Sequence, residues 1–313
     1  MKVVELWRYP VKSMGGERVD ATVVGERGLH GDRLWAVRDE ERGVLTHAKR
    51  HPKLLLCAAR FVTEPAPDVG PGTIPAVTIT LPDRSEVSSD DPEVHERLSA
   101  LVGHRVTLCS LRPASDRTHY KGVKSTANDM RADFAIGESE ALPDFSMMPM
   151  AKLMELGTYA TPPGTYFDAM TLHVVTTASI ETLKTTGGSD FDVRRFRPNV
   201  VIENAGNGFV EAEWTGGSLT LGACTAFVDC PTPRCSMPTR AQAGLPADPK
   251  VLRTIVQAAE RCLGAYATVT RGGAVRVGDA VTFEPAETSR IGEWARARAA
   301  GLKRMLIRAA MPK

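Results

Sequence analysis

Short apolar stretches cut by glycine and proline constrain the fold of this 313-residue chain more than any other feature. In the first hundred residues they have the length of β-strands, and a loop rich in proline and glycine spans 64–75. Strand signals at this spacing are typical of a barrel or a sandwich. The expected strands are 3–9, 19–24, 33–39, 53–61, 76–81 and 105–111. One helix is expected from Asp91-Pro92, which suit a helix start, to Val102, just before Gly103.

The second half continues the pattern of short strands. They are predicted at 172–175, 200–202, 218–221, 225–228, 265–270, 275–277 and 280–283, and the pair 265–270 and 275–277 reads as a hairpin across Gly272-Gly273. Helices are expected from about 177 to 183 and from 249 to 262. The segment 113–167 has no clear periodicity apart from a short helix near 149–156, so the main break in organisation falls there.

These signals predict a mainly β protein with some α. We expect one domain at 1–115, an irregular connecting region at 116–165, a second domain at 166–285, and a basic amphipathic helix at 286–313. Such a helix can lie on an anionic membrane surface or dock on its own protein, and we favour docking.

Composition excludes several classes of protein. A formal net charge of +2 argues against a nucleic-acid partner, because nucleic-acid binders usually carry a strong basic excess. The N-terminus lacks the pattern of a secretory signal, and no apolar run is long enough to span a membrane, so a cytoplasmic location is expected. Six scattered cysteines in a chain of this length are not a disulfide framework.

Cys235 is the main candidate for chemistry. A thiolate is a strong ligand for transition metals, and the neighbouring Arg234 favours the thiolate over the thiol. Cys230 precedes it at a spacing that does not match a zinc knuckle, which argues against structural zinc. Taken alone, the two cysteines can also be core residues or a redox pair, and the residue type favours a structural role.

Basic residues occur in three extended segments. Guanidinium groups bind phosphate through two parallel hydrogen bonds, so such segments could form an anion site if they converge. Each segment alone is also typical of a solvated surface. The segments hold Lys12 and Ser13; Arg33; and Arg194, Arg195 and Arg197 with Asn199. His173 lies in an apolar run and is expected to be a buried structural histidine.

Several of these stretches together resemble the MOSC family. The resemblance is closest to its two-part members, such as the mitochondrial amidoxime-reducing component and its bacterial relatives. It is carried by Tyr9-Pro10-Val11-Lys12-Ser13, Gly28-Leu29 with Asp32-Arg33-Leu34-Trp35, Arg195-Phe196-Arg197-Pro198-Asn199, Arg234-Cys235 and Val277-Gly278-Asp279-Ala280-Val281. The chain departs from the family after the cysteine, at Ser236 to Gly244, and at Thr46 to Arg50.

The resemblance implies an N-terminal β-barrel domain, a MOSC β-barrel domain and a molybdenum cofactor (Mo-molybdopterin). Cys235 matches the family's metal-ligating cysteine. Cofactor-contacting positions are matched by Lys12, Ser13, Arg33, Arg197 and Asn199.

Three functions are compatible with that resemblance. The first is an oxidoreductase that reduces small N-hydroxylated compounds. Its electrons would come from an external flavin or iron–sulfur reductase, because the chain's cysteines lack ferredoxin-like spacing. The second is a sulfur carrier or sulfurtransferase that bears a persulfide on Cys235. The third is a protein that binds the cofactor without turnover.

Overall fold

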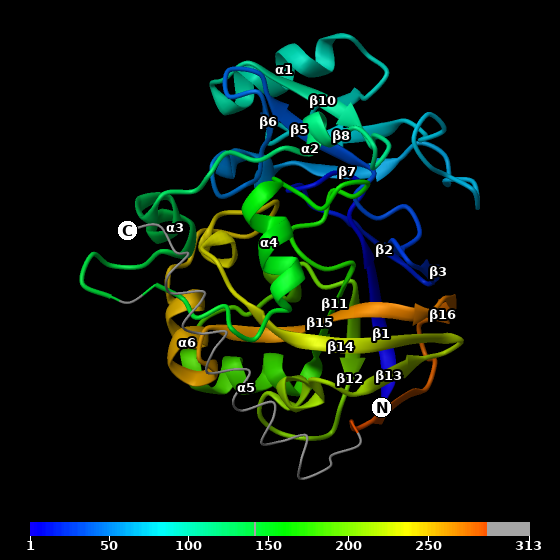
Figure 1. The fold of residues 1–313 in the computed structure, drawn as a ribbon, viewed down its shortest axis with the longest axis vertical. Helices are drawn as coiled ribbons and strands as arrows, with labels where there is room; N and C mark the ends of the chain where they lie inside the picture. Colours follow the sequence, from blue (N-terminus) through cyan, green and yellow to red (C-terminus); the bar gives the residue numbers. More distant parts are fainter. Residues whose placement is uncertain (141, 287–313) are drawn as a thin grey trace.

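Strands dominate the computed structural model, which describes residues 1–140 and 142–286 (Figure 1). The expectation of a mainly β fold with some α is confirmed. Within the described ranges the strands form one eight-stranded sheet and three smaller sheets, none of which closes into a barrel. The predicted tail helix lies outside the described residues from position 287 onward.

The eight-stranded sheet joins both ends of the chain. Its order is β17-β13-β14-β15-β11-β12-β1-β2. The N-terminal β1 runs antiparallel to β12, with Leu6 opposite Val200. The first strands therefore pair with the second half of the sequence, while the proposed domain limits themselves stay a prediction. The bounds are β1 (Lys2–Arg8), β2 (Glu17–Val19), β11 (Leu172–Thr176), β12 (Val200–Glu203), β13 (Ser218–Leu221), β14 (Cys224–Pro233), β15 (Cys262–Arg271) and β17 (Val281–Glu284).

Three sheets of three strands complete the β-structure. Their orders are β10-β5-β6, β16-β3-β4 and β7-β8-β9. The bounds are β3 (Ala21–Gly25), β4 (Gly28–Leu29), β5 (Trp35–Asp39), β6 (Val44–Leu45), β7 (Ala58–Phe61), β8 (Val77–Thr80), β9 (Glu86–Ser88), β10 (Val106–Ser110) and β16 (Gly273–Arg276).

The helices begin and end largely where the sequence indicates. The backbone N–H of Glu93 donates to the Asp91 side chain at 2.9 Å, and Gly103 ends the first helix in the left-handed conformation that glycine tolerates. The connecting region, expected to be mostly irregular, contains three helices. The bounds are α1 (Glu93–Val102), α2 (Arg117–Tyr120), α3 (Ala127–Phe134), α4 (Met150–Thr158), α5 (Thr177–Gly187) and α6 (Lys250–Ala259).

Two local predictions are wrong. The expected strand 53–61 begins as a 3-10 turn at Pro52–Leu56, because a proline at its first position favours a turn start, and only β7 is extended. The expected hairpin of 265–270 with 275–277 does not form, because β16 pairs with β3 from the N-terminal region.

Two main hydrophobic cores lie on either side of the segment that follows β1. Leu6 is buried in the core of the large sheet, and Val11, only five residues later, is buried in the core of the N-terminal sheets. The backbone between them therefore crosses from one core to the other. No helix in the described ranges has the length and apolar character needed to cross a membrane.

Gly28 sits at a close contact between the two halves of the chain. Its backbone is left-handed, with φ at +77°, and a Cβ at this position would lie 2.2 Å from the backbone oxygen of Thr171. A side chain here meets backbone that cannot rotate away, so β4 can approach the segment before β11 only with glycine at this position.

We expect Gly28→Ala to lower the free energy of unfolding by about 3 kcal/mol, the sum of left-handed strain and overpacking. Gly103→Ala is the matched control, because Gly103 has the same φ of +77° but no atom within 4 Å of an added Cβ. It should lose only about 1–2 kcal/mol. Urea unfolding of both variants measures the difference, and equal losses would contradict the close-contact argument.

Candidate functional site

An open pocket lies between the segment before β5, the segments before β11 and β12, and the end of β14. It holds about 570 Å³ of empty space, part of which is open solvent. Four of the six predicted site residues line it: Arg33, Arg197, Asn199 and Cys235. The other lining residues include Phe167, Asp168, His173, Arg234, Met237 and Tyr266. The fold thus brings together Arg33 and Cys235, which are 202 positions apart in the sequence.

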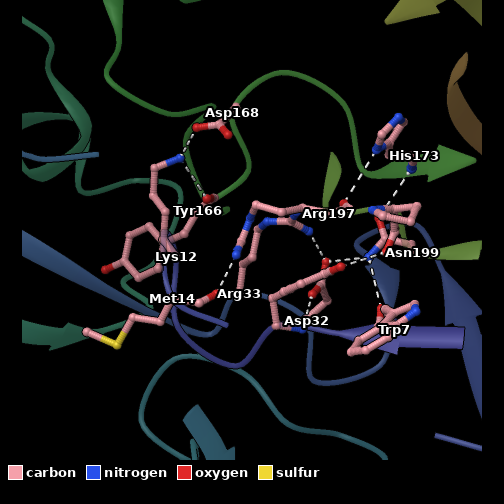
Figure 2. Close-up of polar contacts among 12 residues, drawn as sticks. Trp7, Lys12, Met14, Asp32, Arg33, Tyr166, Asp168, His173, Arg197 and Asn199 are labelled. Carbon is pink, nitrogen blue, oxygen red and sulfur yellow. Dashed lines mark hydrogen bonds and ion pairs between the residues drawn. The ribbon is translucent and has the colours of Figure 1, made fainter. Parts of the chain in front are cut away.

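The carboxylate of Asp32 fixes the geometry beside this pocket, and the sequence analysis did not single it out. Its side chain has no exposed surface. It accepts a hydrogen bond from the Tyr9 backbone N–H at 2.7 Å and one from Asn199 Nδ2 at 2.9 Å, and it forms an ion pair with Arg33 (Figure 2). In the sequence, Asp32 appears only as the acidic residue before Arg33, in one of the stretches that carry the family resemblance.

Asn199 joins β1 to β11. Its Oδ1 accepts from the His173 backbone N–H at 3.2 Å, and its Nδ2 also donates to Trp7 O at 3.4 Å. The amide is therefore satisfied within the protein. Its predicted contact with a cofactor stays a prediction, and the role that the structure gives it is to hold the pocket wall.

Arg33 and Arg197 form the cationic side of the pocket. Their guanidinium carbons lie 5.1 Å and 4.2 Å from the centroid of the Tyr9 ring. Burial and the nearby charge of Arg33 lower the pKa of Arg197 to about 10. Arg197 Nη1 donates to Met14 O, whereas the buried Nη2 has no partner in the described part of the chain. A buried donor without a partner is costly, so this side of the pocket suits an anion.

Lys12 and Ser13 make their contacts within the protein. The Lys12 ammonium forms an ion pair with Asp168 and donates to Tyr166 O at 3.2 Å (Figure 2). Burial lowers the pKa of Lys12, although Asp168 opposes that shift. The Ser13 hydroxyl accepts from the Ala48 backbone N–H at 3.0 Å. Neither residue lines the pocket, so their predicted contacts with a cofactor stay untested.

Asp168 is a pocket residue that the sequence analysis missed, because it follows two aromatic residues in a segment without periodicity. Its side chain is 56% exposed and lines the pocket. Although desolvation acts in the opposite direction, Lys12 and Arg33 hold the pKa of this carboxyl well below its usual range. The group is therefore an anion at neutral pH.

Cys235 follows β14 and is held by its backbone neighbours. The N–H of Arg234 donates to Arg261 O at 2.8 Å, and the N–H of Ser236 donates to Asp133 O at 2.9 Å. The cysteine is partly exposed on the pocket wall. Cys230, in contrast, is fully buried in a hydrophobic cluster and does not line the pocket.

Two further cations lie near the sulfur. Arg234 donates to Phe196 O at 2.9 Å, and its Nε has no partner among the described residues. Lys49 pairs with Asp133 at 2.7 Å. Burial lowers the pKa of Lys49, but Cys235 and Asp133 outweigh burial and raise it above its usual value.

The other basic residues of the predicted cluster have structural roles. The Arg195 guanidinium donates to the backbone oxygens of Asp190, Pro238 and Pro246. Arg194 pairs with Asp192 at 2.7 Å near the surface. The expectation of a buried His173 is confirmed, and burial together with Arg234 lowers its pKa to about 3, which keeps the ring neutral.

The donor set fits an anionic cofactor that brings its own metal ligands. Within residues 1–140 and 142–286, no group of three His, Cys, Asp or Glu residues could hold a metal ion. Cys235 can therefore supply one sulfur, and other ligands would have to come from a cofactor. The unpartnered nitrogens of Arg197 and Arg234 provide donors for an anionic group.

Two protein-family models together match most of the chain. The model of the MOSC domain matches residues 163–282, and that of the MOSC N-terminal beta barrel domain matches residues 1–102. No curated protein matches the chain. Similar solved structures include the YUAD protein from Bacillus subtilis, which is 13% identical with a TM-score of 0.44; the match covers 91% of this chain and 96% of that protein. They also include YiiM from Geobacillus stearothermophilus, which is 17% identical with a TM-score of 0.30; that match covers 37% of this chain and 54% of YiiM. The chain therefore belongs to the MOSC family, whose members in general bind the molybdenum cofactor, and its match to the MOSC N-terminal beta barrel domain precedes its MOSC domain.

Proposed function

We propose that this protein is a molybdenum-cofactor-dependent oxidoreductase that reduces N-hydroxylated compounds. The observation that carries the proposal is the position of Cys235 on the wall of a pocket that also holds Arg33, Arg197 and Arg234. The overall reaction takes up two electrons and two protons, breaks one N–O bond and releases water. When bound, the cofactor would supply the two-electron redox chemistry.

The protein's own residues bind and orient. Arg197 and Arg234 offer unpartnered donors to an anionic group such as a phosphate. The thiolate of Cys235 would serve as the protein's metal ligand. Asp32 locks Arg33 and Asn199 in place, so the pocket wall is preorganised before a ligand arrives.

The electrons would come from a separate reductase. The cysteines of the chain are scattered and lack the spacing of an iron–sulfur site. A flavin or iron–sulfur protein is therefore proposed as the donor.

The alternative is a sulfur carrier that holds a persulfide on Cys235. The observation that favours it is that the cations Lys49 and Arg234 lie near the Cys235 sulfur. In the described ranges, no group of protein side chains that could hold a metal ion accompanies this sulfur. Nearby positive charge favours an anion such as a persulfide. Molybdenum bound in stoichiometric amount favours the oxidoreductase. Cyanide-releasable sulfur without metal favours the carrier.

Cys235→Ala should bind less molybdenum than the wild type. It should also lose activity toward an amidoxime by at least about 100-fold, because losing a metal ligand costs more than the 10–100-fold cost of losing a ligand's hydrogen-bond partner. Elemental analysis and turnover with a reduced artificial dye measure both. Cys230→Ala is the control, since Cys230 is buried away from the pocket. A Cys235→Ala protein with wild-type turnover would refute the assignment.

Arg197→Lys should retain about tenfold less cofactor. Lysine keeps the positive charge but cannot form the two parallel hydrogen bonds by which a guanidinium binds phosphate. Arg194→Lys, three positions earlier, is the control, because Arg194 pairs with Asp192 outside the pocket. The fluorescence of the oxidised pterin released from each purified protein reports cofactor content. Equal content in both variants would show that Arg197 does not bind the phosphate.

A further inference from the structure

The pocket combines a cationic side with one carboxylate. Among its described lining residues only Asp168 is acidic, whereas Arg33, Arg195, Arg197 and Arg234 are basic. A ligand that is anionic throughout would be repelled at Asp168, and a neutral ligand would leave the arginines unmatched. The lining therefore favours a ligand with an anionic end and a separate edge of hydrogen-bond donors.

Asp168 is held in a position that can accept such donors. Its Oδ1 pairs with the Lys12 ammonium, which Tyr166 O also anchors (Figure 2). Its Oδ2 receives no hydrogen bond from the described part of the chain, and more than half of the side chain is exposed. An ionised carboxylate only accepts hydrogen bonds, so its natural partner is a group that presents N–H bonds.

We propose that Asp168 recognises a planar N–C–N donor edge, of the kind found in amidines, guanidines and 2-aminopyrimidinones. Two adjacent N–H groups on such an edge match the carboxylate fork, as they do in an arginine–carboxylate pair. Phe167, which precedes Asp168, lines the same pocket and offers an aromatic wall to a flat group.

Two ligands of the proposed function carry this edge, so the inference rests on that function. One is the aminopyrimidinone ring of the pterin, and the other is an amidoxime substrate or its amidine product. Their shared chemistry makes Asp168 a determinant of how the cofactor is oriented, or of which N-hydroxylated compounds bind.

Matched probes separate the two sources in the full-length protein without cofactor. Pterin carries the donor edge, and lumazine replaces its 2-amino group by a carbonyl. Benzamidine carries the edge in the form of an amidine, and benzamide lacks it. Titration calorimetry measures the affinity of each probe for the wild type, Asp168→Asn and Glu64→Gln.

Glu64→Gln is the control because Glu64 also pairs with a buried cation, Arg8, at 2.6 Å and is 67% exposed, yet it lines no part of this pocket. Because binding needs no metal and no turnover, this experiment is independent of whether the protein proves to be an oxidoreductase.

The wild type should bind at least one donor-edge probe about tenfold more tightly than its counterpart, and Asp168→Asn should remove that preference, because hydrogen bonds to a charged group are the stronger ones. If Asp168→Asn loses only the preference for pterin over lumazine, Asp168 recognises the cofactor. If it loses only the preference for benzamidine over benzamide, Asp168 recognises the substrate. If it loses both preferences, Asp168 recognises the donor edge that the two ligands share. Unchanged preferences in Asp168→Asn, or an equal loss in Glu64→Gln, would overturn the proposal.

Discussion

The buried carboxylate of Asp32 is the interaction on which the site depends. Its two oxygens accept from the backbone of Tyr9, from Asn199 and from Arg33, which come from three separate segments. Two of these segments lie in the N-terminal third of the chain, and the third lies near residue 199. Separating these segments would leave the buried Asp32 carboxylate without its partners. Because an unpaired buried charge is costly, Asp32 holds the three segments together.

The pocket keeps an unbalanced positive charge beside this anchor. Arg33 and Arg197 share the Tyr9 ring, and burial together with the nearby charge of Arg33 lowers the pKa of Arg197. A fold sustains such a like-charge pair only when rigid neighbours hold it, and an anion that binds between the pair relieves the repulsion. The same arrangement that costs stability without a ligand therefore favours binding of one.

Much of the fold could be predicted because local chemistry decides it. The Asp91 and Gly103 signals place α1, and the apolar run 172–175 becomes β11. The pairing of β16 with β3 could not be predicted. The pattern Gly272-Gly273 indicates a local hairpin, and nothing in it shows that the distant strand β3 pairs with β16 instead. In the site, Cys235, Arg33, Arg197 and Asn199 were found through motifs. Asp32 and Asp168 were missed because an acidic residue in a loop gains meaning only from the cations that the fold brings to it.

If the cofactor binds as proposed, one protein sulfur contacts the molybdenum in this pocket. X-ray absorption at the molybdenum edge of the loaded protein counts the sulfur atoms bound to the metal. Our account predicts that the wild type has one more sulfur neighbour than Cys235→Ser. An equal sulfur count in the two proteins, or a wild type that binds no molybdenum when expressed in a host that supplies it, would contradict the account.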